Sequence, residues 1–255
     1  MNLKLLACEV ITREICYCVA RAPHAVTPSF TPKDKHNQPG ELQRFLQDQI
    51  GAASEEETRY DAILLGYGLC GNATLGLVAR DIPLVAPRAH DCTTLFLGSK
   101  ELFKTYFGAN PSQSWASVGY SERGKSVLSD SAMRHWLGDG GADENYQALV
   151  EQYGEENAQY LMDAMRPAKD TGFIYYLDIP ETREPAVAER IRKEAERSGA
   201  ELRALQGSIR LIDMLVSGHW PEDEFLVVPP GQKLTAVYDY DEVIRAEPVC
   251  KNQVE

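Results

Sequence analysis

Three cysteines in the first half of the chain each follow the predicted carboxyl end of a strand: Cys8, Cys70 and Cys92. The strands are predicted from short apolar runs at residues 3–7, 62–65 and 82–86. In an open α/β sheet the carboxyl ends of parallel strands meet at one edge, and ligands bind there. We therefore expect these three thiols, which are far apart in sequence, to converge on one site.

Three thiolates are soft ligands, and together they suit zinc or an iron–sulfur cluster. The chain lacks the C-x-x-C pairs typical of a closed structural zinc site, so we expect an open coordination position at a cleft. His90 is a fourth or alternative ligand, because it lies two residues before Cys92. Two alternatives remain open: a metal-free reactive thiol, with Cys70 at the N-terminus of a helix, and cysteines that are buried only for packing.

Glycines surround Cys70 in the sequence Gly-Tyr-Gly-Leu-Cys-Gly-Asn. Since glycine lets the backbone turn sharply and approach a ligand closely, we predict that Gly68 and Gly71 contact a bound cofactor. Gly66, Gly68 and Gly71 also match the G-x-G-x-x-G pattern of dinucleotide-binding proteins. We do not predict a dinucleotide site, because the next strand ends in Ala-Pro-Arg-Ala-His without the expected acidic residue.

Three polar residues beside the cysteines are candidate catalytic groups. Glu9 follows Cys8 directly and is a general base or a ligand, unless it caps the following helix. Asn72 orients a substrate or caps a helix. Arg88 binds a carboxylate or a phosphate of the substrate, or forms an ordinary salt bridge.

The alternation of strands and helices predicts an α/β protein with two Rossmann-like lobes, each with a parallel sheet. We expect a first lobe at residues 1–107, a helical bridge at 108–170, a second lobe at 171–245 and a tail at 246–255. Residues 84–96 and 226–238 share Leu, Val, Pro and Thr at matching positions, which suggests an internal duplication. Further expectations are a loop at 22–40, helices at 73–80, 132–137 and 145–165, and second-lobe strands at 172–178, 201–205 and 225–228.

The composition excludes several classes of protein. A net charge of −12 argues against nucleic-acid binding, because neutralising phosphates requires a basic surface. No apolar run approaches the roughly 20 residues of a membrane span. The N-terminus lacks the shape of a signal peptide, so we predict a cytoplasmic protein whose six cysteines are reduced and whose ligand is a small molecule.

At its motifs the chain resembles a bacterial and archaeal family catalogued as a domain of unknown function. The resemblance is carried by Ala-Cys-Glu at residues 7–9, the glycine run at 66–72, Pro-Arg-Ala-His-Asp-Cys at 87–92 with Leu-Gly-Ser at 97–99, and Phe-Leu-Val-Val-Pro-Pro-Gly-Gln at 225–232. Members are often encoded near corrinoid-dependent methyltransferases, so the resemblance implies one-carbon or methyl-group metabolism. His90 and Cys92 are also similar to the zinc motif of methylcobamide:thiol methyltransferases, although there the other cysteine lies downstream.

We therefore predict a metal-dependent enzyme of small-molecule metabolism, a transferase or a lyase, with zinc or an iron–sulfur cluster as cofactor. The first alternative is a non-catalytic accessory or carrier protein for a metal or a corrinoid, whose partner is a corrinoid protein or a methyltransferase. The second is a cysteine-nucleophile enzyme without metal.

Overall fold

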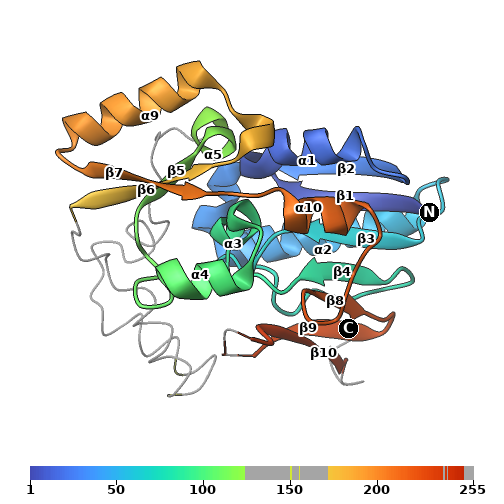
Figure 1. Ribbon diagram of the computed structural model, residues 1–255. Helices are drawn as coiled ribbons and strands as arrows, with labels where there is room; N and C mark the ends of the chain where they lie inside the picture. The colour runs from blue at the N-terminus through green and yellow to red at the C-terminus, as the bar shows by residue number, and fades with distance from the viewer. Residues whose placement is uncertain (124–149, 151–154, 156–171, 238, 240, 250–255) are drawn as a thin grey trace.

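The computed structural model describes residues 1–123, 150, 155, 172–237, 239 and 241–249. The protein is a mixed α/β structure around a mostly parallel five-stranded sheet of order β2-β1-β3-β4-β8 (Figure 1). The four parallel strands are β1 (Asn2–Cys8), β2 (Ala25–Thr31), β3 (Ala62–Gly66) and β4 (Leu84–Pro87). The fifth, β8 (Phe225–Val228), pairs antiparallel with β4.

The central strands are apolar because both faces of the sheet are covered, as parallel sheets require. All five residues of β3 are buried, and β1 is buried from its second residue onward. β2 differs, because it lies at the edge of the sheet and pairs only with β1. It contains Pro28, which an edge strand tolerates. The loop predicted over residues 22–40 is therefore wrong in its first part.

Helices cover both faces of the central sheet. On one face, α1 (Thr12–Val19) packs against α10 (Arg210–Val216), and α10 contacts β3 and β4. On the other face, α2 (Pro39–Glu55) contacts β1. Two short helices, α3 (Cys92–Leu97) and α4 (Lys100–Phe107), follow the carboxyl end of β4 (Figure 1).

A second, smaller sheet lies beyond the carboxyl ends of the central strands (Figure 1). Its strands are β5 (Trp115–Ser117), β6 (Phe173–Asp178) and β7 (Glu201–Gln206), all parallel. Two helices accompany it, α5 (Val118–Arg123) and α9 (Pro185–Arg197). Because α5 packs on the 3-10 turn η1 (Glu9–Ile11) directly after β1, this unit adjoins the edge where the thiols were predicted.

Several predicted boundaries need correction. β8 was expected in a second lobe, yet it belongs to the central sheet. The strands that begin the two matching segments, β4 and β8, are antiparallel neighbours in one sheet, and a duplication into two lobes is not confirmed. β5 lies within the predicted bridge but pairs with β6. A further strand, β10 (Ile244–Pro248), extends into the predicted tail. The helices predicted at 132–137 and 145–165 fall, apart from Val150 and Glu155, outside the described residues.

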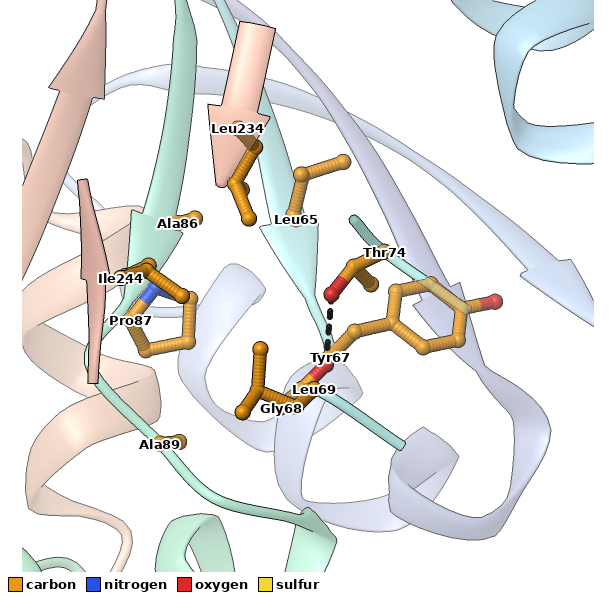
Figure 2. A pocket seen from close by; sticks show the side chains of 10 residues that line it. All are labelled: Leu65, Tyr67, Gly68, Leu69, Thr74, Ala86, Pro87, Ala89, Leu234 and Ile244. Carbon is orange, nitrogen blue, oxygen red and sulfur yellow. Dashed lines mark hydrogen bonds between the residues drawn. The ribbon is translucent and has the colours of Figure 1, made fainter. Parts of the chain in front are cut away.

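The hairpin formed by β9 (Gln232–Ala236) and β10 (Ile244–Pro248) is hydrogen-bonded to the segment that follows β3. The backbone N–H of Gly76 donates to the carbonyl of Leu234 at 2.7 Å, and Leu234 in turn donates to Leu77 at 2.9 Å. Residues 70–76 form successive turns, so the helix predicted at 73–80 is wrong. Between this segment, β4 and the hairpin lies a small hollow of about 10 Å³, lined mainly by apolar residues, with room for about one water molecule (Figure 2).

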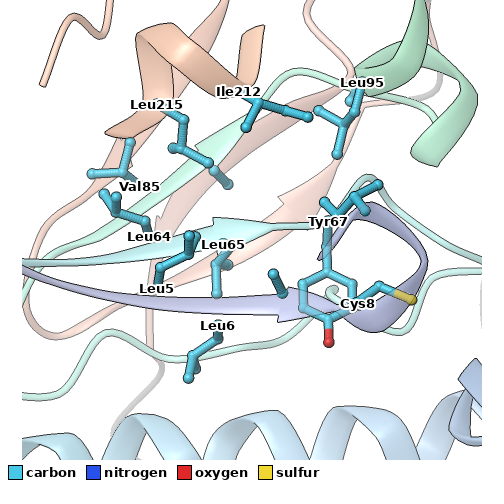
Figure 3. Packing of buried hydrophobic residues seen from close by; sticks show 14 of the residues in the cluster. Leu5, Leu6, Cys8, Leu64, Leu65, Tyr67, Val85, Leu95, Ile212 and Leu215 are labelled. Atoms are coloured by element: carbon cyan, nitrogen blue, oxygen red, sulfur yellow. The ribbon is translucent and has the colours of Figure 1, made fainter. Parts of the chain in front are cut away.

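The core fixes the strand that ends at Cys8. Along β1, successive leucines point to opposite faces, and Leu5 pairs with Leu64 while Leu6 pairs with Leu65. Figure 3 shows Leu64 on the side of α10, where Ile212 and Leu215 of α10 cover it. Burying each such leucine contributes about 1.5–3 kcal/mol to the free energy of folding. This packing holds β1, and with it Cys8, in a fixed position.

Candidate functional site

The three predicted thiols lie at the carboxyl edge of the central sheet. Cys8 is the last residue of β1 and is buried. Cys70 lies in the turn after β3, and Cys92 is the first residue of α3 after β4; both are half-buried. The chain passes from β1 to β2 on one side and then to β3 on the other, which makes the β1–β3 boundary the switch point of the sheet. Ligands of open α/β sheets bind at such a point.

An ionised Cys8 would raise the pKa of both Cys70 and Cys92, and an ionised Cys70 would raise that of Cys92, so the three thiols lie in one neighbourhood. Burial raises the pKa of Cys70 above its ordinary value, and the charge of Cys8 raises it further. Burial also raises the pKa of Cys92, with additional contributions from Asp91, Cys70 and Cys8. Cys8 itself has its pKa raised to about 12, mainly by burial, although Lys33 acts in the opposite direction.

These raised pKa values determine the state of the thiols near neutral pH. Without a bound metal ion, all three remain protonated and are poor nucleophiles, even though the charge of Lys33 acts on Cys8. A metal ion reverses this, because it binds the thiolate and displaces the proton. The donor set therefore fits a soft metal ion or an iron–sulfur cluster. Among the described residues, however, no three candidate donors stand at metal-binding positions.

Gly68 lets the Cys70 turn reach the His90–Cys92 segment. A Cβ atom at Gly68 would lie 2.6 Å from Asp91 Cα and 2.7 Å from Asp91 N, so only glycine fits this contact without displacement. The next residue strengthens the contact, since the Leu69 N–H donates to the carbonyls of Ala89 and His90, each at 3.1 Å. The glycine that was predicted to contact a cofactor thus positions the thiol loop.

The backbone at Cys70 itself is unusual. Cys70, Gly71 and Asn72 are three consecutive residues in the left-handed region, with φ of 48°, 65° and 69°. Cysteine adopts this conformation at a cost of about 1–2 kcal/mol, and such strain gathers at functional sites. This path precludes a helix starting at Cys70. The predicted activation of Cys70 by a helix N-terminus is therefore wrong.

His90 lies next to the thiols, but its ring packs against aromatic neighbours. It stacks on Phe103 with ring centroids 5.0 Å apart and an interplanar angle of 23°. Its Nδ1 lies 3.8 Å from Oδ2 of Asp91. The other oxygen of Asp91 accepts hydrogen bonds from Thr93 N and Thr94 N, which caps α3. His90 as a ligand remains a prediction.

The candidate catalytic residues have different surroundings. Oε1 of Glu9 accepts a hydrogen bond from the backbone N–H of Lys33 at 2.6 Å. Asn72 occupies one of the left-handed positions and is half-buried. Arg88 donates to the carbonyls of Glu222 at 2.7 Å and Glu242 at 2.6 Å, and also to that of Ile244. Arg88 therefore joins β4 to the C-terminal hairpin; catalysis by these three residues remains a prediction.

Sequence reasoning missed three residues on the β1 side of the thiols. Tyr67 is 2% exposed, and the charges of Cys8 and Cys70 both act on it. His36 stacks on Tyr67 with centroids 5.9 Å apart. Lys33 acts electrostatically on both Cys8 and His36. The position of Tyr67 inside the glycine run was the only signal, because His36 and Lys33 lie in a polar segment typical of a solvated loop.

Comparison with known families bears on the whole arrangement. The family model for a protein of unknown function, DUF1638, matches residues 30–216. The chain belongs to the DUF1638 family. The match includes Cys70 and Cys92 of this DUF1638 protein, while Cys8 lies before it. No curated protein and no solved structure matches the sequence. Within the described part of the DUF1638 chain, no helix combines the length and apolar character that a bilayer span requires.

Proposed function

We propose that this DUF1638 protein is a metal-dependent enzyme of small-molecule metabolism, a transferase or a lyase. In this proposal Cys8, Cys70 and Cys92 hold a zinc ion or an iron–sulfur cluster, and His90 is a further or alternative ligand. The supporting observation is that thiols from three strand ends lie at the switch point of the sheet, near enough for Cys8 to affect the pKa of both Cys70 and Cys92. Packing alone does not require three cysteines at such an edge.

The bound metal would supply a Lewis acid or an open iron to which a substrate atom binds. The residues of the chain provide the surroundings. Gly68 holds the Cys70 turn against Asp91, and the strained backbone at residues 70–72 fixes the direction of the thiol. Glu9 and Asn72 are the candidate groups for moving a proton and orienting the substrate. We retain the prediction of a cytoplasmic protein, because the thiols must stay reduced to bind metal.

The reaction class we favour is transfer of a one-carbon or methyl group. This part of the proposal rests on the resemblance of the motifs to a family encoded near corrinoid-dependent methyltransferases. A corrinoid protein or a methyltransferase is then the macromolecular partner.

A second candidate function is that of a non-catalytic carrier for a metal or a corrinoid. One observation favours it: the hollow of about 10 Å³ is too small for a substrate and is lined by Leu65, Thr74 and Leu234 among others, but by none of the three thiols. Cys70 and Cys92 are partly exposed, as a protein that passes its metal to a partner would need.

Metal analysis with an absorption spectrum on anaerobically purified protein tests the metal site. Broad visible absorbance indicates a cluster, whereas a colourless sample with one zinc per chain indicates the zinc site. We expect Cys70→Ser to abolish binding. Cys16→Ser is the matched control, since Cys16 is an exposed thiol on α1 and should not affect binding.

Two outcomes would count against this proposal. A chain that holds no metal after anaerobic reconstitution with zinc or with iron and sulfide removes it. Equal loss of metal from Cys70→Ser and Cys16→Ser removes the choice of ligands. To separate enzyme from carrier, the loaded protein is mixed with a chromogenic zinc chelator: rapid release favours a carrier, and retention favours a resident cofactor.

A further inference from the structure

We propose that the ligand meeting the thiols carries a carboxylate, which binds to a polar wall formed by Lys33, His36 and Tyr67. This inference names the substrate class of the proposed metal site and therefore rests on the proposed function. The wall lies at the carboxyl ends of β2 and β3, on either side of Cys8. Two of its features, judged among the described residues, point to a ligand: a cation without a carboxylate partner there, and buried polar atoms without a hydrogen bond there.

Lys33 supplies the cation. It follows β2 directly, and β2 is in register with β1 so that Thr31 lies opposite Cys8. Its Nζ lies 4.3 Å from the centroid of the Tyr120 ring, which fixes the ammonium group through a cation–π contact. No described carboxylate forms an ion pair with it, although the chain carries a net charge of −12. Its charge nevertheless acts on Cys8, so it lies near that thiol.

His36 supplies a buried polar atom. Its Nε2 is inaccessible to solvent and forms no hydrogen bond with any described residue. Burial and the charge of Lys33 lower the pKa of His36 to about 4, so the ring is neutral near pH 7. A neutral imidazole with its proton on Nε2 donates one hydrogen bond. Leaving such an atom buried and unpaired costs about 1–3 kcal/mol, which a ligand would recover.

Tyr67 completes the wall. Its hydroxyl is buried and makes no hydrogen bond of ordinary geometry within the described part of the chain. Burial raises its pKa well above the ordinary value, the charge of Cys8 adds to this, and Thr31 acts in the opposite direction. In Figure 3 the hydroxyl lies beside Cys8, and in Figure 2 it points away from the apolar hollow. It therefore faces the thiol side.

The charge of the wall selects the ligand. One ammonium, one imidazole N–H and one phenol O–H match the single negative charge and the oxygen lone pairs of a carboxylate. A phosphate dianion requires more positive charge than one lysine provides. The carboxylate of Glu9 accepts a hydrogen bond from the backbone N–H of Lys33, not from its ammonium group.

Calorimetric titration of the zinc-loaded full chain tests this inference with two thiols of similar size. Mercaptoacetate carries a carboxylate, and 2-mercaptoethanol does not. We expect the wild-type protein to bind mercaptoacetate about tenfold more tightly, as a charge-assisted hydrogen bond implies. Lys33→Met should remove this preference, and Lys33→Arg should keep it.

Lys35→Met is the matched control. Lys35 lies on the same 3-10 turn, η2 (Lys33–Asn37), and its Nζ is 4.9 Å from the Phe45 ring. The two substitutions remove the same charge from a lysine above an aromatic ring, but only Lys33 acts on Cys8 and His36. The control should retain the preference.

The outcomes separate this inference from the metal proposal. Equal affinity for the two thiols with zinc bound overturns the carboxylate site and leaves the metal site standing. A protein that binds no zinc is titrated with acetate instead, and the His36 ring signals are followed by NMR. If acetate shifts them and acetamide does not, the anion site stands without the metal; if neither shifts them, both proposals fall.

Discussion

Gly68 lies directly against the backbone of Asp91, at a distance that leaves no room for a side chain. This contact joins the turn that carries Cys70 to the segment that carries Cys92. The contact therefore sets how closely the two thiols approach each other.

Replacing Gly68 with alanine should separate the Cys70 turn from Asp91. Because the added Cβ would meet backbone atoms that cannot rotate away, we expect a loss of about 1–3 kcal/mol in the free energy of unfolding. Metal binding should weaken in parallel. Urea denaturation and metal stoichiometry measure the two effects. Gly40→Ala is the control, since its Cβ would meet no atom within 4 Å; equal destabilisation by both changes would contradict the role of the contact.

Substitutions at Asn72 distinguish a role of this residue in backbone conformation from a role in orienting the substrate. At φ of 69°, Asn72→Ala should cost about 1 kcal/mol, whereas Asn72→Gly should be close to neutral in stability. Urea denaturation of the three proteins measures this order. If Asn72 also orients substrate, the glycine variant will fold normally yet lose ligand binding. A glycine variant as unstable as the alanine variant would show that the side chain itself holds the turn.

The affinity for metal should rise with pH. The pKa of each of the three thiols is raised by burial, so binding near pH 7 releases a proton from every thiol that becomes a ligand. Each released proton increases the apparent affinity about tenfold per pH unit. Competition with a zinc chelator from about pH 6.5 to about pH 8.5 measures how steeply the metal affinity changes with pH. Cys70→Ser should lower the slope or abolish binding, and an affinity independent of pH would exclude thiol ligands.

Glu14 should destabilise the protein as the pH rises. It is fully buried in α1, where Thr182 donates to its Oε1 at 2.9 Å and its Oε2 has no described partner. Burial raises its pKa from 4.5 to about 7. The folded state therefore holds this proton more tightly, and the resulting stability is complete below pH 4.5 and is lost as the pH rises through about 7.

Glu14→Gln tests this dependence, because glutamine keeps the shape and does not ionise. We expect the variant to be more stable than the wild type at pH 8 by about 1–3 kcal/mol, with the difference shrinking toward pH 5. Urea denaturation at both pH values measures it. Glu9→Gln is a control on a carboxylate that is not buried; a constant difference across the pH range would mean that Glu14 is ionised in the folded protein.

The sequence was sufficient to predict the thiol edge. Cys8, Cys70 and Cys92 each follow a short apolar run, and parallel strands must bring their carboxyl ends together. The same reasoning failed for residues 73–80, where apolar spacing favoured a helix. Their path is set by the left-handed backbone before them and by hydrogen bonds to Leu234, which is distant in sequence.

Other features depended on contacts that local sequence does not encode. β2 was missed because Pro28 and polar neighbours are typical of a loop, and only its position at the sheet edge makes a strand acceptable. His36 and Lys33 looked solvated for the same reason. The stacking of His36 on Tyr67 and the position of Lys33 near Cys8 follow from the pairing of β2 with β1, which residues 22–40 alone do not specify.

The order of strands in the central sheet has a practical consequence for recombinant work. β1 occupies an interior position between β2 and β3, yet it precedes the stretch that defines the family, and β8 to β10 come after that stretch. A plasmid encoding only residues 30–216 would omit an inner strand, one of the three sulfurs and the hairpin that anchors the turn carrying another. Expression of such a fragment should yield aggregated material, so biochemical assays of this protein need a chain that extends beyond the shared segment at both ends.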